Sequence, residues 1–110
     1  MRSILATVAA FVVGAVFFLA SPAMAADAGA GAQVFSANCA ACHICGGNVI
    51  NSAKTLKQDA LVANGKDTAE AIAYQVTNGT GAMPAFGGRL TPDQIDNVAA
   101  YVIAQAENGW

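Results

Sequence analysis

Apolar residues follow two different patterns along this chain. In residues 1–25 they form an almost continuous run, with 19 hydrophobic side chains and a single charge, that of Arg2. In residues 26–110 they recur at helical spacing between polar positions, which is typical of amphipathic helices that pack against a common core. No strand is predicted in this second part. The pattern therefore predicts a small all-α domain that follows a separate apolar segment.

Four helical segments are predicted in residues 26–110. The last is the clearest, because Thr91 precedes it as a cap, Pro92 lies in its first turn and Gln94 completes a capping box. The third is expected to begin with another capping box, formed by Asp67 and Glu70. The segments cover residues 31–38, 55–64, 67–78 and the stretch after Thr91, and their apolar positions are Val34 and Phe35; Leu56, Ala60 and Ala63; Ala69, Ile72, Ala73 and Val76; and Ile95, Val98, Ala99, Val102, Ile103 and Ala106.

Residues 1–25 have the parts of a secretory signal peptide. Arg2 is the positive charge, residues 4–20 are an uncharged apolar run, and Ala23-Met24-Ala25 supplies the small residues of a cleavage site. The alternative is an uncleaved membrane anchor, because a run of 17 residues is at the lower limit of what spans a bilayer. The cleavage motif directly after the run favours removal. We therefore expect a mature domain of residues 26–110 that is exported from the cytoplasm.

The composition of residues 26–110 narrows the possible functions. Four basic side chains stand against seven acidic ones, a formal net charge of −3, so there is no basic patch for nucleic acid. A domain of this length buries too little apolar surface to be very stable. Such a domain is often stabilised by a covalent cross-link or a bound cofactor. The three cysteines lie within seven residues of one another, so they cannot form a disulfide framework across the domain.

The candidate chemistry is concentrated in Cys39-Ala40-Ala41-Cys42-His43. A C-x-x-C-H run is the attachment signature of a c-type haem, in which each thiol adds across a vinyl group and the adjacent histidine binds the iron. We expect this run to form a short helical turn. One alternative is a thioredoxin-like redox pair, which expects a βαβ pattern. The other is a zinc site that uses Cys39, Cys42, His43 and Cys45, although structural zinc usually draws on two separated ligand pairs.

Met83 is the candidate for the second axial ligand. It is the only methionine of residues 26–110 and lies in a glycine-rich loop, residues 78–88, next to Pro84. The alternative is that Met83 fills the core, as a single methionine often does. Ligation by His43 and Met83 fills both axial positions and raises the haem potential, which suits electron transfer better than oxygen chemistry.

Together these motifs resemble the cytochrome c6 family, the photosynthetic electron carriers of cyanobacteria and many algae. The resemblance covers essentially all of residues 26–110. The matching motifs are Ala37-Asn38-Cys39-Ala40-Ala41-Cys42-His43, Gly46-Gly47-Asn48-Val49-Ile50, Lys54-Thr55-Leu56, Tyr74-Gln75-Val76, Asn78-Gly79, Ala82-Met83-Pro84-Ala85-Phe86, Ala99-Ala100-Tyr101-Val102 and Trp110.

The resemblance implies a class I cytochrome c fold, with about four helices around one covalent haem. It implies a carrier in the thylakoid lumen, and possibly also the periplasm, that takes electrons from cytochrome f of the cytochrome b6f complex and delivers them to photosystem I. A respiratory terminal oxidase as acceptor is the alternative, and a haem enzyme such as a peroxidase, which needs an open axial position, is a further one. The expected function is therefore that of an electron carrier and not of an enzyme.

The resemblance also implies roles for residues outside the attachment motif. Gly31, Phe35 and Tyr101 are expected at the crossing of the first and last helices. Gln75 is expected near the haem, where it is linked to a high potential. Arg89, in the loop after Met83, is expected to contribute to docking with photosystem I.

Two features depart from the family pattern. Cys45 stands where the family usually has a glycine or another small residue, and we expect it to be a tolerated substitution and not a haem attachment site. Residues 51–53 lack a proline that many relatives carry near the axial histidine. The sequence therefore does not identify the carbonyl group that accepts the ring proton of His43.

Overall fold

The computed structural model describes residues 25–110, so the predicted signal peptide lies outside the described residues except for Ala25. The described part contains helices and two isolated β-bridges, and it has no strand, which confirms the all-α prediction. In chain order the elements are α1 (Ala28–Asn38), α2 (Ala40–His43), the 3-10 turn η1 (Ile44–Gly46), α3 (Gln58–Ala63), α4 (Ala69–Asn78) and α5 (Pro92–Asn108).

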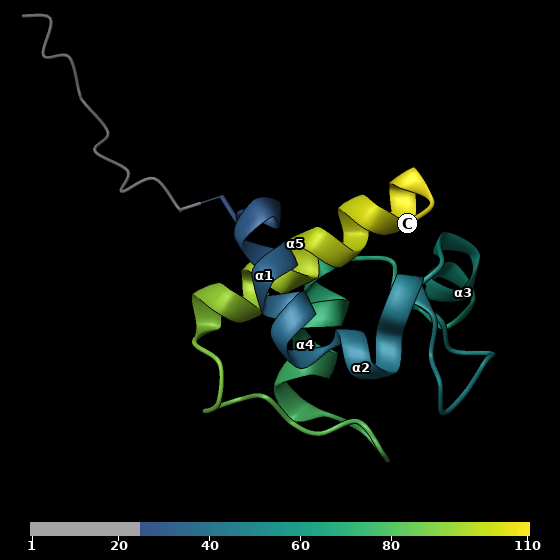
Figure 1. The fold of residues 1–110 in the computed structure, drawn as a ribbon, viewed down its shortest axis with the longest axis horizontal. Helices are drawn as coiled ribbons and strands as arrows, with labels where there is room; N and C mark the ends of the chain where they lie inside the picture. The colour runs from purple at the N-terminus through teal and green to yellow at the C-terminus, as the bar shows by residue number, and fades with distance from the viewer. Residues whose placement is uncertain (1–24) are drawn as a thin grey trace, which may run out of the picture.

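Helices α1 and α5 cross near the centre of the molecule (Figure 1), and Gly31 lies at the crossing. A Cβ atom on Gly31 would collide with the backbone carbonyl of Asn97 and would lie 2.9 Å from Cβ of Tyr101. One turn later the ring of Phe35 packs on Tyr101, with 5.3 Å between the ring centroids. The predicted crossing of the first and last helices at these residues is confirmed.

The capping box predicted for α5 is also confirmed. The hydroxyl of Thr91 accepts a hydrogen bond from the backbone N–H of Gln94 at 3.2 Å, and the Gln94 side-chain oxygen accepts one from the Thr91 N–H at 2.9 Å. The helix ends at Gly109, whose left-handed conformation (φ 82°) lets the N–H of Trp110 bond to the carbonyl of Gln105 at 2.8 Å.

Helix α1 begins earlier than the sequence predicted, at Ala28 instead of residue 31. The carboxylate of Asp27 caps it by accepting hydrogen bonds from the N–H groups of Gly29 and Ala30. The first turn contains alanine and glycine, which carry little amphipathic signal, so only the cap marks the start.

Helices α3 and α4 correct two further predictions. Helix α3 spans Gln58–Ala63 and not residues 55–64, and its buried residue is Leu61 instead of the predicted face of Leu56, Ala60 and Ala63. At the start of α4 the cap is Thr68, whose hydroxyl accepts from the Ala71 N–H at 3.1 Å, so the Asp67–Glu70 capping box was wrong. Thr68 accepts from the N–H group three residues after it, as the predicted cap Asp67 was expected to do, so the cap lies one residue later than predicted.

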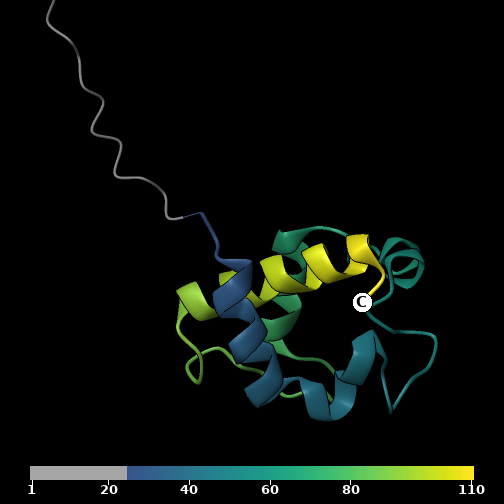
Figure 2. The same cartoon turned by 45° about the horizontal axis from the view of Figure 1, so that its top comes forward.

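The hydrophobic core lies between α4, the buried face of α5 and the crossing of α1 with α5. Helix α4 lies beside α5 in both cartoon views (Figures 1 and 2). Its buried residues are Phe35, Leu61, Ile72, Val76, Phe86, Ile95, Val98, Ala99, Val102 and Ala106. No helix within residues 25–110 is long and apolar enough to cross a membrane.

The turn that follows α2 has an unusual backbone. Cys45 adopts φ 53° and ψ 29°, and Gly46 follows with φ 74°. The left-handed region costs a residue with a side chain about 1–2 kcal/mol, whereas glycine adopts it freely. The family glycine expected at position 45 therefore has a conformational reason, and Cys45 is tolerated there under strain.

Replacement of Gly31 by alanine is expected to lower the free energy of unfolding by at least about 2 kcal/mol, because the added methyl group overpacks the crossing. The change is measured by guanidinium denaturation of the haem-containing protein. The matched control is Ser36→Ala, an exposed position on the same helix, which should change stability little. Equal stability of the Gly31→Ala protein and the wild type would contradict the close approach.

Replacement of Cys45 by glycine is expected to raise the free energy of unfolding by about 0.5–1 kcal/mol, because relief of the left-handed strain exceeds the added freedom of the unfolded chain. Cys45→Ala is the control, since it removes the thiol and keeps the strain. Both are measured by denaturation under reducing conditions. If the glycine and alanine variants are equally stable, the backbone conformation of Cys45 is not the source of the difference.

Candidate haem site

The predicted attachment motif forms one helical turn directly after α1. Cys39 ends α1, since its N–H bonds to the carbonyl of Phe35 at 2.8 Å, and it begins α2, since its carbonyl accepts from the His43 N–H at 2.9 Å. Because residues three apart lie on the same side of a helical turn, this geometry presents Cys39 and Cys42 together. The expectation of a short helical turn is confirmed.

The environments of the three thiols differ, and none is in a disulfide. Cys39 is half-buried and packs against the core, whereas Cys42 and Cys45 are exposed. Burial, with a smaller contribution from Cys42, raises the pKa of the Cys39 thiol to about 11. Cys39 therefore lies at the edge of the core, with its thiol protonated at neutral pH.

The ring of His43 is oriented by a backbone carbonyl. Its Nδ1 atom lies 2.8 Å from the carbonyl oxygen of Gly47. Because a carbonyl only accepts hydrogen bonds, Nδ1 carries the proton and Nε2 keeps its lone pair for a metal ion. Gly47 thus supplies the acceptor that the sequence did not identify. No local sequence signal marks this acceptor, because every backbone carbonyl can accept a hydrogen bond.

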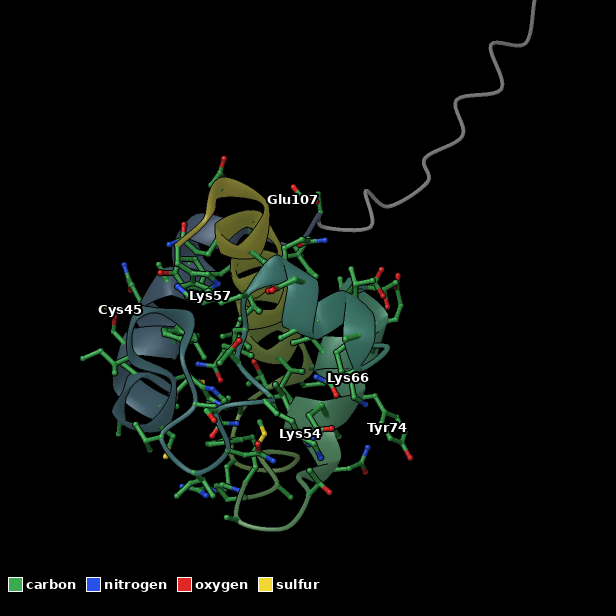
Figure 3. The ribbon with its side chains drawn as sticks, turned by 90° about the vertical axis from the view of Figure 1, so that its right-hand side faces the viewer. Cys45, Lys54, Lys57, Lys66, Tyr74 and Glu107 are labelled. Carbon is green, nitrogen blue, oxygen red and sulfur yellow. The ribbon has the colours of Figure 1, made fainter. Side chains whose placement is uncertain are left out.

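The loop between η1 and α3 is organised by Asn48. Its side-chain oxygen accepts from the N–H groups of Ile50 and Asn51, both at 3.0 Å, and its side-chain NH₂ donates to the carbonyl of Lys54 at 2.9 Å. The Asn48 amide therefore holds the loop. The side chain of Lys54 is exposed, on the face shown in Figure 3.

Met83 is presented by a tight loop. The backbones of Thr80 and Met83 pair through two hydrogen bonds of 3.0 and 2.9 Å. Gly79, with φ 64°, permits the close approach, since a Cβ there would lie 2.6 Å from the Met83 carbonyl oxygen. Met83 is half-buried and packs against the core. A braced loop that presents one soft donor fits an axial ligand better than a core-filling role.

Gln75 contacts the sulfur atom of Met83. Its Nε2 group donates to Met83 Sδ at 3.7 Å from α4, where Gln75 is half-buried. A thioether is a weak acceptor, but an amide donor withdraws electron density from it and fixes the direction of the remaining lone pair. The structure therefore brings Gln75 and Met83 together. The position of Gln75 near the haem, which the resemblance implied, stays a prediction.

The donors suit a haem and do not suit a zinc ion. Cys39, Ala40 and Met83 pack against the same core although they are far apart in sequence. Two free thiols three residues apart on one helical turn, an oriented imidazole and a thioether match the requirements of a c-type haem. Within residues 25–110, no three His, Cys, Asp or Glu side chains gather where they could hold a metal ion, so this geometry does not support the zinc alternative that used Cys45.

Arg89 is exposed at the end of the Met83 loop. Its guanidinium carbon lies 5.0 Å from the ring centroid of Phe86, and its backbone N–H donates to the Phe86 carbonyl at 2.9 Å. Since Phe86 belongs to the core, this cation–π contact anchors the charge to the loop. The Arg89 side chain is therefore at the surface, and its expected role in docking with photosystem I stays a prediction.

A family model described as "Cytochrome C oxidase, cbb3-type, subunit III" matches residues 26–102. Cytochrome c6 of Leptolyngbya boryana is 69% identical over 85 residues, which cover 77% of this chain and all of the relative. Cytochrome c6 of Synechococcus sp. (strain ATCC 27167 / PCC 6312) is 54% identical over 110 residues, covering 100% of this chain and 98% of the relative.

Solved structures agree with these relatives. Cytochrome c6 of the diatom Phaeodactylum tricornutum superposes with a TM-score of 0.73 at 58% identity, over 76% of this chain and 99% of that chain. Oxidized cytochrome c6A of Arabidopsis thaliana superposes with a TM-score of 0.74 at 36% identity, over 76% of this chain and 94% of that chain. The chain therefore belongs to the cytochrome c6 family, with the class I cytochrome c fold, and is an electron carrier with one covalently bound haem c.

Proposed function

We propose that this cytochrome carries single electrons from cytochrome f of the cytochrome b6f complex to photosystem I. The observation that carries the proposal is the presentation of two axial donors, each already oriented by a hydrogen bond: His43 by Gly47 and Met83 by Gln75. A site with both axial positions filled suits electron transfer. The relatives from photosynthetic organisms support the choice of partners.

The residues have distinct roles in this proposal. Cys39 and Cys42 would form the thioether bonds, His43 would bind the iron through Nε2, and Met83 would bind it through Sδ. When bound, the haem would supply a one-electron couple of ferric and ferrous iron. The hydrogen bonds to His43 and Met83 orient both side chains before the group is bound.

Two hydrogen bonds act on the potential in opposite directions. The Gly47 carbonyl draws on the Nδ1 proton and makes His43 a stronger donor, which favours ferric iron. The Gln75 amide draws electron density from the Met83 sulfur, which favours ferrous iron and a higher potential. Gln75 is therefore the residue through which α4 raises the potential of the carrier.

The same arrangement argues against a haem enzyme. Peroxidase chemistry needs an open axial position, whereas here the Thr80–Met83 pairing braces the loop that presents the second donor. We therefore place the protein among carriers and not among enzymes.

We propose that the apolar segment of residues 1–25 directs export from the cytoplasm. The resemblance to cytochrome c6 points to the thylakoid lumen, and to the periplasm where one is present, as the destination. We propose cleavage after Ala25, which yields a mature domain of residues 26–110. This length is supported by the 85-residue alignment that spans the whole of the Leptolyngbya relative.

Docking with photosystem I is assigned to the surface that includes Arg89. The cation–π contact with Phe86 restricts the guanidinium, so less side-chain freedom is lost when it meets a carboxylate of the partner. Arginine offers a permanent charge and a planar fork for that role. The other basic residues of the mature chain are lysines, shown together in Figure 3.

Replacement of Met83 by histidine is expected to lower the midpoint potential by on the order of 100 mV or more, because a nitrogen ligand favours ferric iron more than a thioether does. Gln75→Val should lower it by a smaller amount. Gln33→Val, the same chemical change on the exposed side of α1, should have no effect. The measurement is a spectroelectrochemical titration. An unchanged potential in the Met83→His protein would mean that another residue is the ligand.

Replacement of Arg89 by glutamate is expected to slow reduction of photosystem I by at least about tenfold at low salt, a barrier increase of roughly 1.4 kcal/mol. The rate is measured by flash photolysis with the purified protein, whose potential should be unchanged. Lys66→Glu is the control, because it makes the same charge change outside the Met83 loop. The defect should shrink as salt screens exposed charges. Equal slowing by the two variants would assign the effect to net charge and not to Arg89.

A further inference from the structure

The last residue of the chain, Trp110, packs against the turn that follows the axial histidine. A Cβ atom built on Gly46 would lie 2.5 Å from indole Cε2 of Trp110, so the ring fills the space that a side chain would take. The indole N–H donates to the carbonyl of Leu56 at 2.7 Å. Trp110 therefore contacts this region through both its ring face and its polar edge.

Leu56 connects the indole to the turn. Its carbonyl accepts from Trp110, and its own N–H donates to the carbonyl of Gly46 at 2.7 Å. Gly46 is thus held from two directions, by the hydrogen bond from Leu56 and by the ring of Trp110. Gly46 is buried although it lies in a connecting turn.

The next residue, Gly47, presents the carbonyl that accepts the Nδ1 proton of His43 at 2.8 Å. Two consecutive glycines have no side chains of their own to fix a backbone conformation, and Cys45 before them is in a left-handed conformation. Within the turn, the Gly47 N–H bonds to the carbonyl of Ile44 at 3.0 Å. On the side of Asn48, the Val49 N–H bonds to the carbonyl of Cys42 at 3.0 Å. A further constraint on the direction of the Gly47 carbonyl comes through Gly46 from Leu56 and Trp110.

Trp110 is itself held firmly enough to act as a support. Its ring packs on Phe35 with 5.4 Å between centroids and meets Tyr101 edge-on at 6.0 Å. The backbone N–H of Trp110 is bonded to the carbonyl of Gln105 at the end of α5. In both cartoon views the C-terminus lies between α3 and the end of the α2–η1 segment (Figures 1 and 2).

We propose that Trp110 is a positioning residue for the axial ligand: through Leu56 and Gly46 it fixes the Gly47 carbonyl that orients and polarises His43. The inference rests on the proposed role of His43 as an iron ligand. Loss of the indole N–H frees Leu56 and Gly46, so the Gly47 carbonyl holds the Nδ1 proton less tightly. His43 then becomes a weaker donor, and ferrous iron is favoured.

The test compares Trp110→Phe, which keeps an aromatic ring and removes the N–H donor, with the wild type. Exchange of the His43 Nδ1 proton is followed by NMR in the ferrous protein, and the potential is measured by spectroelectrochemical titration. We expect exchange to be at least about tenfold faster in the variant, because local opening of this bond becomes easier, and the potential to shift upward. Gly46→Ala, which pushes the indole from the other side, should give the same two changes.

The control for a merely structural role is Val98→Ala, at a buried position of α5 that is 1% exposed and belongs to the core cluster. It should lower stability and leave both readouts at His43 unchanged. Wild-type exchange and potential in the Trp110→Phe protein, or equal shifts in the Val98→Ala protein, would overturn the inference. Absence of an iron-bound His43 signal in the wild type would instead refute the proposed ligation.

Discussion

The close crossing of α1 and α5 at Gly31 is the constraint on which the rest of the structure depends. Because Gly31 has no side chain, the carbonyl of Asn97 and the side chain of Tyr101 come against the backbone of α1. The end of α1 runs directly into the attachment turn, and the end of α5 reaches back to Gly46. One helix contact therefore helps to position both the residues that we propose hold the haem and the residue that we propose supports them, Trp110.

The two axial donors are prepared by different means. His43 lies on a helical turn whose hydrogen bonds fix its backbone, and a carbonyl from the following turn fixes its ring. Met83 lies on a loop, where the pairing with Thr80 and the contact from Gln75 replace helical constraint. Both side chains proposed as axial donors are thus oriented by the protein itself, which lowers the cost of assembling the site.

The sequence predicted those features that are encoded by neighbouring residues. Thr91 and Gln94 identified the start of α5, and the spacing of Cys39 and Cys42 identified the attachment turn, because each signal is local. The caps at Asp27 and Thr68 were missed or misplaced, since several nearby residues could serve and packing selects one. The Gly47 carbonyl was not predictable, because any backbone carbonyl is a possible acceptor until the fold brings one to His43. The support from Trp110 was missed for the same reason, as it joins residues 54 positions apart.

Covalent attachment at Cys39 and Cys42 is the step on which the proposed function depends, and peptide mass spectrometry after alkylation of the denatured protein tests it most directly. The expected result is one haem on the segment that contains both cysteines, with Cys45 as the single alkylated residue. Alkylation of Cys39 or Cys42, or haem bound through Cys45, would contradict the assignment. The measurement needs no redox partner, so its result stands whichever protein receives the electron.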